Sequence, residues 1–327
     1  MLLTERERIE WIDILKGIGI LAVVWGHSGS SIAKYLYWFH MPLFFLISGF
    51  LYNHTKAQST SARSYTLQKA KHLLLPYFFY LTSIALMQIT ATLISTHHLQ
   101  MKVSFLTLLL GGRGLSGIYG VFWFITTLFA VQITYFFLDK TKTPVRITFI
   151  LSSYLAAHIE SHYWPLIYIP WNLDISLYAI TFYAIGDLLR RSKLLRKSYF
   201  NAWFTLLPIV IIFAFIVLYS KGILAFHLDL KSHEYNHLLT DFIVPLSIIL
   251  ILITCSMVLQ RYRIFSYIFA YIGRASMVIM YLHIFMAFFV AEFLHINPLI
   301  FFITGVGLSL LFYEFVSRIK ALNFLAN

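Results

Sequence analysis

The feature that most constrains this chain is a repeated pattern of apolar runs, each about as long as a membrane-spanning helix, separated by short charged or turn-rich breaks. A helix needs about 20 residues to cross ~30 Å of hydrocarbon. Hydrophobic residues make up 60% of the 327 residues and charged residues only 12%, whereas soluble domains carry roughly 25% charged residues. The pattern therefore predicts an all-α, polytopic transmembrane helical bundle and excludes a water-soluble fold.

We expect about ten spans in one integral-membrane domain covering residues 1–327, because no stretch is polar enough for a separate globular domain. The expected spans are 12–33, 37–53, 73–95, 119–138, 145–159, 172–189, 200–219, 241–259, 275–294 and 298–316. The segment before the first span has no clear cleavage site, so we expect it to be retained. The single cysteine, Cys255, excludes an internal disulfide.

The formal net charge of +12 is explained by topology. If the N-terminus is cytoplasmic, all but five of the 25 Lys and Arg residues fall in expected cytoplasmic segments. The five expected on the outer side are Lys34, Lys102, Arg113, Lys221 and Lys231. Because cytoplasmic loops are enriched in Lys and Arg, this asymmetry predicts that both termini are cytoplasmic. We therefore expect the lipid bilayer, and no nucleic acid, to be the partner of the basic residues.

Histidines show the opposite bias. Those in or near expected outer loops are His97, His98, His158, His162, His227, His233, His237 and His295. Their spacing is irregular, and no cysteine or paired carboxylate accompanies them. We therefore predict solvated loop histidines and no metal site.

A glycine-rich segment fits the phosphate-binding pattern G-x-G-x-x-G at residues 112–117. That pattern cradles a pyrophosphate when it follows a strand and opens a helix of a soluble α/β unit. Here no strand is predicted before it, and an expected span follows. We therefore expect a flexible or re-entrant connection, which a membrane protein tolerates where the segment contacts protein or water.

The first expected span carries Lys16 and His27, eleven positions apart. At 100° per residue they lie within about 20° of one helix face, with a rise of about 16 Å between them. His27 then lies near the middle of the membrane, where ionisable groups are usually functional. For Lys16 two interpretations stay open: a functional cation, or a side chain that reaches the inner headgroups with Asp13 as its partner.

The second expected span begins near the outer face. His40 precedes Pro42 there, and the turn from the first span is short, so His40 can approach His27. Ser48-Gly49 predicts close helix packing. Tyr35, Tyr37 and Trp38 predict an outer belt of aromatic anchors.

The loop after the second span is strongly basic. It carries Arg63, Lys69, Lys71 and His72 before the third span. The positive-inside rule accounts for such a cluster. A site for an anionic cofactor is the alternative, because clustered cations bind phosphates.

Several motifs, in order along nearly the whole chain, resemble the membrane-bound acyltransferase 3 family, and most closely its stand-alone fucose 4-O-acetyltransferase-like members. The most specific are residues 13–20 leading to Gly26-His27-Ser28, and residues 39–50, which contain Phe39-His40-Met41-Pro42 and Ser48-Gly49-Phe50. Weaker agreement comes from Leu75-Pro76-Tyr77, Trp123-Phe124, Phe182-Tyr183-Ala184-Ile185-Gly186, and residues 272–276 running to Leu282-His283.

The resemblance implies a transferase that moves an acyl group, usually acetyl, from cytoplasmic acetyl-CoA to a hydroxyl of a carbohydrate at the outer face, without a metal. It implies a multi-pass protein of the bacterial cytoplasmic (inner) membrane. The family's catalytic histidine corresponds to His27, with His40 as a second candidate. The expected donor-binding residues are Lys16, Arg63, Lys69, Lys71 and His72. The expected supporting residues are Asp13, Trp123, Arg274 and His283.

Two other functions remain possible at this stage. The first is a transporter or translocase of a lipid-linked glycan or a small anionic solute, which would use acidic residues in or near helices as pathway residues. Those residues are Asp174, Asp187, Glu292 and Glu314. No inverted repeat supports this alternative. The second is a membrane scaffold without chemistry, which leaves Lys16 and His27 unexplained.

Overall fold

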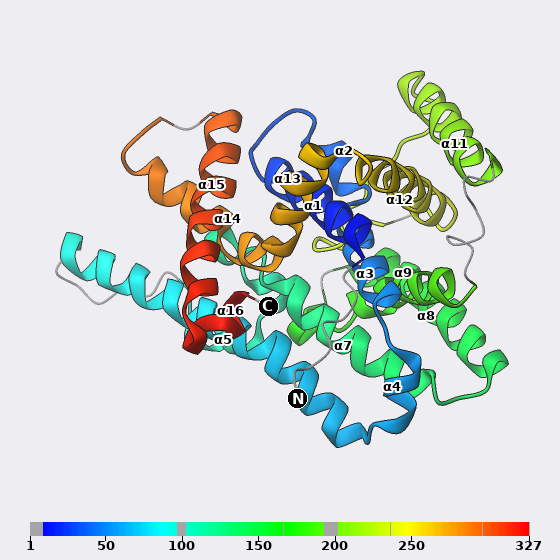
Figure 1. Ribbon diagram of the computed structural model, residues 1–327, viewed down its shortest axis with the longest axis horizontal. Helices are drawn as coiled ribbons and strands as arrows, with labels where there is room; N and C mark the ends of the chain where they lie inside the picture. The colour runs from blue at the N-terminus through cyan, green and yellow to red at the C-terminus, as the bar shows by residue number, and fades with distance from the viewer. Residues whose placement is uncertain are drawn as a thin grey trace.

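The computed structural model describes residues 9–96, 103–165, 167–192, 202–235, 237–295 and 297–326. Within these residues the chain is helical, and the β pairing is limited to one bridge between Asp229 and Glu234. The helices (Figure 1) are α1 (Glu10–Gly26), α2 (Ala33–Tyr37), α3 (His40–Phe50), α4 (His54–Ser59), α5 (Ala62–Thr96), α6 (Phe105–Leu110), η1 (Gly112–Gly114), η2 (Gly117–Tyr119), α7 (Trp123–Leu138), α8 (Thr143–Tyr163), η3 (Pro170–Asn172), α9 (Ile175–Arg191), α11 (Ala202–Ser220), α12 (Thr240–Leu259), α13 (Arg263–Arg274), α14 (Ser276–Ala291), α15 (Pro298–Arg318), η4 (Lys320–Leu322) and α16 (Asn323–Ala326). His97 and His98 lie outside the described residues.

The all-helical class is confirmed, and every expected span overlaps a helix. Four helical segments of the described chain are long and apolar enough to cross a membrane: Ala62–Ile94, Gly117–Leu138, Thr240–Leu259 and Pro298–Arg318. The bent pair α13 and α14, which meet at 73°, adds a fifth if it forms one span. The other expected spans are helices that are shorter or less apolar: α3, for example, has 11 residues, and α8 has 21 residues but is not apolar enough. Ten spans therefore stay a prediction.

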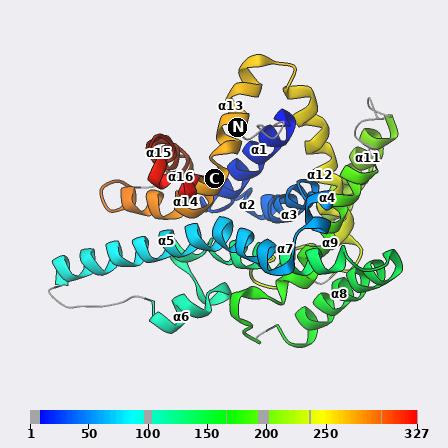
Figure 2. The ribbon, with the colours of Figure 1, turned by 60° about the horizontal axis from the view of Figure 1, so that its bottom comes forward.

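Two glycines bring α1 and α13 into backbone contact, and the two helices lie side by side (Figures 1 and 2). A Cβ atom on Gly17 of α1 would lie 2.1 Å from the carbonyl oxygen of Phe269. A Cβ atom on Gly273 of α13 would lie 1.8 Å from the carbonyl oxygen of Asp13. Small residues at such a crossing allow the helix axes to approach closely. This crossing fixes the position of α1.

A second reciprocal pair of glycines joins α3 to α9. A Cβ atom on Gly49 would lie 1.8 Å from the carbonyl oxygen of Tyr183, and one on Gly186 would lie 2.0 Å from that of Leu46. The predicted close packing is confirmed for Gly49. Ser48 has a different partner, because its hydroxyl oxygen accepts a hydrogen bond of 2.9 Å from the Gln132 amide of α7.

Asp139, at the end of α7, forms hydrogen bonds and ion pairs with residues at the ends of several other helices. Burial by itself raises the pKa of a carboxyl, yet hydrogen bonds from Arg191 and His54 hold the pKa of Asp139 below its usual value. The side chains that donate to or pair with its carboxylate are those of Tyr52, His54, Gln58, Arg146 and Arg191. Arg191 also pairs with Asp187 at 2.6 Å. Asp187 therefore has a structural partner.

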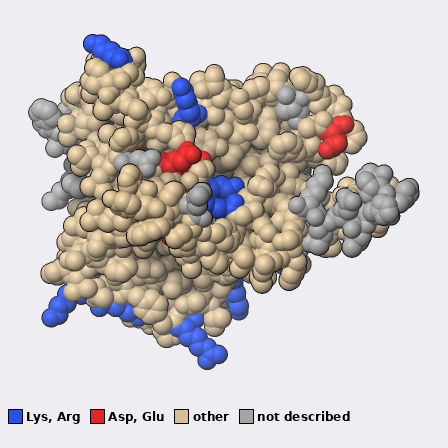
Figure 3. Space-filling model, turned by 180° about the vertical axis from the view of Figure 1, so that it is seen from behind, with Lys and Arg blue, Asp and Glu red and all other residues tan. Residues whose placement is uncertain are grey.

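The outside of the molecule is largely apolar. Figure 3 shows one face on which most of the surface carries no Lys, Arg, Asp or Glu. Large hydrophobic side chains such as Phe213, Ile264, Ile303 and Leu311 are exposed on α11, α13 and α15. Exposed apolar patches of this extent indicate contact with lipid.

We predict that Gly49→Ala destabilises the protein. The added methyl group has no room against the Tyr183 carbonyl, so α3 and α9 must separate, at a cost of about 1–3 kcal/mol of unfolding free energy. Thermal unfolding in detergent measures the effect. Gly307→Ala on α15 is the matched control, because nothing lies within 4 Å of that Cβ position. Equal melting temperatures for the two variants would contradict the prediction.

Candidate functional site

His27 stands at the end of α1, where the helix stops and the chain turns back. Its backbone N–H donates to Val23 and Val24 as the C-cap of α1. Gly29 follows with φ of +75°, a conformation that glycine adopts at no steric cost. The short helix α2 then returns the chain, so that the Tyr37 hydroxyl lies 3.3 Å from Nδ1 of His27. Local turn geometry thus places a phenol against the imidazole.

Two further histidines approach His27 from other helices. The ring of His283, on α14, has its centroid 5.3 Å from that of His27. The ring of His40, at the start of α3, lies 4.9 Å from that of Tyr37, which contacts His27. His40 and His283 are buried, whereas His27 remains partly accessible. We call His27, Tyr37, His40 and His283 the histidine cluster.

Backbone carbonyls determine the proton positions on two of the rings. Nδ1 of His283 lies 2.7 Å from the carbonyl oxygen of Ile279, and Nδ1 of His40 lies 2.5 Å from that of Leu36. A carbonyl oxygen only accepts, so Nδ1 carries the proton in both rings. Nε2 then presents a lone pair. His27 faces a hydroxyl that can donate or accept, so either tautomer fits.

Lys231, in the loop between α11 and α12, lies near the histidine cluster. Its ammonium group donates a hydrogen bond of 2.8 Å to the carbonyl oxygen of Leu115 in the glycine-rich segment. It lies within electrostatic reach of His27. Burial lowers the pKa of Lys231, and the nearby carboxylate of Asp229 offsets part of that effect. A partly buried cation therefore lies near the cluster.

Sequence reasoning missed Lys231 and assigned Tyr37 only to an aromatic belt. The one sequence signal for Lys231 is that it is a basic residue on the side that the positive-inside rule depletes of bases. Tyr37 gives no signal of its own, because its contact with His27 depends on the turn between α1 and α2.

The glycine-rich segment, residues 111–120, follows helix α6 and no strand, so its context differs from that of a nucleotide-binding loop. Gly112 has φ of +62°, and a Cβ atom there would lie 2.4 Å from the side-chain oxygen of Asn172. That same oxygen accepts a hydrogen bond from the Arg113 backbone at 2.7 Å. The segment is therefore a packed connection.

The remaining predicted site residues lie elsewhere. Lys16 pairs with Asp13 at 3.3 Å, as expected, and its side chain is 26% exposed. It is on α1 but outside the histidine cluster. Trp123 is buried at the start of α7, where its carbonyl oxygen accepts hydrogen bonds from the hydroxyls of Thr126 and Thr127.

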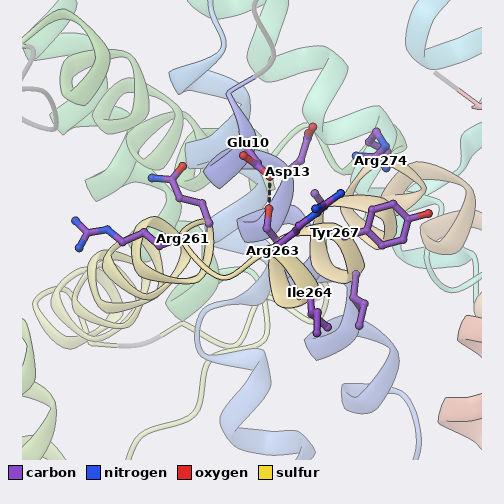
Figure 4. Close-up of a pocket in the computed structure, with 11 residues that line it drawn as sticks. Glu10, Asp13, Arg261, Arg263, Ile264, Tyr267 and Arg274 are labelled. Carbon is purple, nitrogen blue, oxygen red and sulfur yellow. Dashed lines mark hydrogen bonds between the residues drawn. The ribbon is translucent and has the colours of Figure 1, made fainter.

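Two cavities lined by basic residues lie away from the cluster. The larger has a volume of about 840 Å³ and is lined by residues that include Asp13 and Arg274. Figure 4 shows Arg261 and Arg274 on opposite sides of it, with Glu10 and Asp13 between them. The smaller, of about 340 Å³, is on α5 and is lined by Ser61, Arg63, Ser64, Leu67, Gln68 and Lys71. Lys69 and His72 are on the same helix, with the Lys69 ammonium 5.4 Å from the Tyr65 ring. The predicted donor-binding residues thus divide between α1 and α5.

Two of the outer histidines are buried, so the prediction of solvated loop residues is wrong for them. Nε2 of His158 lies 3.1 Å from a carboxylate oxygen of Asp241. His233 lies between two carboxylates, with Nδ1 2.8 Å from Glu160 and Nε2 3.0 Å from Asp174. The carboxylates come from segments distant in sequence, and for this reason histidine spacing did not reveal them.

Glu160, Asp174 and His233 are close enough together to be considered as metal ligands. A single ion binds one nitrogen of an imidazole. Here each ring nitrogen already faces its own carboxylate, and Asp174 also pairs with Arg113 at 3.3 Å. This geometry favours an imidazole held between two carboxylates over a metal ligand. The positive φ of 60° at His233 is held in place by those contacts.

The family comparison covers most of the chain. A family model described as an acyltransferase domain matches residues 9–313, which include every member of the histidine cluster. No curated protein and no solved structure matches the chain.

We predict that His233→Asn destabilises the protein and that a metal chelator does not. Asn tolerates the left-handed backbone, so the variant removes only the ring. It leaves the partly buried Glu160 without this partner and Asp174 paired with Arg113 alone, at about 1–3 kcal/mol. His227→Asn is the control in the same loop, because His227 pairs with Glu234 at the surface, where such pairs contribute about 0–1 kcal/mol. A melting temperature that falls with chelator and recovers with added metal would support an ion site instead.

Proposed function

The chain belongs to the membrane-bound acyltransferase 3 family, and from this premise we propose that it transfers acetyl from cytoplasmic acetyl-CoA to a hydroxyl of an extracytoplasmic or lipid-linked carbohydrate. The observation that carries the proposal is the histidine cluster. His27, a partly exposed residue, lies at the end of α1 beside two buried histidines and a tyrosine hydroxyl. Acyl transfer needs a base or nucleophile of this kind.

The chemistry at His27 has two forms. As a general base, His27 takes the proton of the acceptor hydroxyl while the hydroxyl oxygen attacks the thioester carbonyl; the C–S bond breaks and the CoA thiolate takes up a proton. As a nucleophile, His27 forms an acetyl-imidazole and releases CoA, and the hydroxyl then takes the acetyl group. The partial accessibility of His27 suits both forms, because either requires contact with the substrate.

The donor and the acceptor reach His27 from opposite sides in this proposal. The Lys and Arg asymmetry of the sequence supports cytoplasmic N- and C-termini. Ten spans in a bacterial inner membrane are part of the proposal, and they rest on the apolar runs and on the family. Lys16 then lies on the cytoplasmic side, about 16 Å along α1 from His27. Arg63, Lys69 and Lys71 of α5 lie on the same side of the membrane in this proposal. Lys231 approaches from the outer loop. A thioester from inside can thus meet a carbohydrate hydroxyl from outside.

Ion pairs account for most of the acidic residues that a transporter would use. Asp187 pairs with Arg191, Asp174 with Arg113 and His233, and Glu314 with Arg318. Glu292 is exposed at the end of α14. These contacts favour structural roles and weaken the transport alternative. Flux of a labelled glycan without acetyl-CoA turnover would favour transport.

We predict that His27→Gln abolishes O-acetylation and leaves the protein folded. Loss of a positioned acid–base group lowers the rate about 10²–10⁴-fold. The measurement is transfer of labelled acetyl from acetyl-CoA to membrane glycans, with mass spectrometry for a gain of one acetyl group. His162→Gln, an exposed histidine on α8, is the control. Unchanged acetylation by a folded His27→Gln variant would refute the assignment.

We predict that Lys16→Met, Arg63→Gln and Lys71→Gln each raise KM for acetyl-CoA and leave kcat nearly unchanged. A lost hydrogen bond to a charged group costs about 1.5–3 kcal/mol, which is roughly 10–100-fold, and uniform binding appears in KM. Arg263→Gln, from the larger cavity, is the matched comparison. If only Arg263→Gln raises KM, the donor phosphates bind in the larger cavity.

A further inference from the structure

His283 has an unused lone pair inside the histidine cluster. Its side chain is fully buried, and Nε2 has no hydrogen-bond partner among the described residues. An unpaired buried polar atom destabilises the folded protein. Buried polar groups without partners are uncommon and often mark catalytic positions or ligands still to be bound.

The position of the ring is closely constrained. The Nδ1–H group donates to Ile279 one turn earlier on α14, so the ring is held in the tautomer that exposes the Nε2 lone pair. Behind the backbone of His283, α15 packs through Gly305, where a Cβ atom would lie 3.0 Å from the His283 carbonyl oxygen. The ring itself lies against His27, with centroids 5.3 Å apart. His283 can therefore accept a proton at Nε2 without a change of tautomer or of ring position.

We propose that His283 is a second catalytic residue, the base that takes the proton of the acceptor hydroxyl, while His27 carries the acyl group. The inference rests on the proposed function. It assigns the attack on the thioester to His27 and the removal of the hydroxyl proton to His283. His27 is the partly exposed residue of the two and stands at the end of α1, which suits the residue that meets the donor. A fully buried ring with a fixed lone pair suits the residue that must accept one proton from a hydroxyl group.

The transfer takes place in two steps that conserve atoms and protons. The His27 nitrogen attacks the thioester, a C–N bond forms, the C–S bond breaks, and the proton from His27 leaves with CoA as the thiol. The acceptor oxygen then attacks the acetyl carbon, a C–O bond forms and the C–N bond breaks. The hydroxyl proton passes to Nε2 of His283 and from there to the released His27 nitrogen, which restores both rings.

An acceptor nucleophile that needs no base distinguishes a catalytic role of His283 from a structural role. Hydroxylamine attacks acyl groups without general-base assistance and yields a hydroxamate that is read by colour, after subtraction of the rate without enzyme. We expect His283→Asn to lower transfer to the carbohydrate about 10²–10⁴-fold, with KM for acetyl-CoA and transfer to hydroxylamine near wild type. Asn retains a donor for the Ile279 carbonyl and lacks Nε2. We expect His27→Gln to lose both reactions.

His158→Asn is the matched control. His158 is also buried on a helix, and its Nδ1 lies 2.9 Å from the carbonyl oxygen one turn earlier, that of Tyr154. We expect this variant to keep the wild-type ratio of carbohydrate to hydroxylamine transfer, whatever its stability. If His283→Asn does not fold, His283→Gln is tested in the same way, and restoration of its carbohydrate transfer by added imidazole counts as support.

Two results would overturn the inference about His283. One is carbohydrate transfer at the wild-type rate by a folded His283 variant. The other is an equal loss of both reactions, which indicates a structural role. If the wild-type protein acetylates neither acceptor, the proposed function itself fails, and the inference falls with it.

Discussion

Close contact between helix backbones is the constraint on which the rest of this structure depends. Gly17 and Gly273 allow α1 and α13 to touch, and Gly49 and Gly186 do the same for α3 and α9. In an apolar bundle the hydrophobic effect gives little preference for one helix pairing over another, so packing contacts and hydrogen bonds decide it. These crossings hold α1 and α3 in place, and the turn between them brings Tyr37 to His27.

Polar groups inside the bundle divide into two kinds. Asp139, His158 and His233 are buried and have partners from distant segments. Since an isolated buried charge is very costly, such partners are needed for the chain to fold. His283 is the contrasting case, because its Nε2 has neither a hydrogen bond nor an ion pair among the described residues and its ring lies beside that of His27, whereas His233 has two carboxylates within ion-pair distance. That difference distinguishes a structural histidine from one available for chemistry.

The site also explains why one helix carries both ends of the proposed reaction. Lys16 and His27 share a face of α1, yet Lys16 pairs with Asp13 at the helix start and His27 lies in the histidine cluster at its end. A long thioester can span that separation, whereas a single oxyanion cannot contact both groups. In the proposed reaction the two residues therefore act at different stages, with donor binding at one end of α1 and acyl transfer at the other.

Local patterns in the sequence determined the helical class, the shared face of Lys16 and His27, the Asp13–Lys16 pair and the close packing at Gly49, because each follows from helix periodicity or from a residue's own size and charge. The tertiary structure alone decided that His283 lies beside His27, that Tyr37 contacts it, that Lys231 lies near the cluster, and that His158 and His233 are buried against carboxylates. These contacts join residues that helix periodicity does not relate, since they depend on which helices cross and at what depth. Periodicity identifies which residues share a face of a helix, whereas only tertiary packing determines which helix lies against that face.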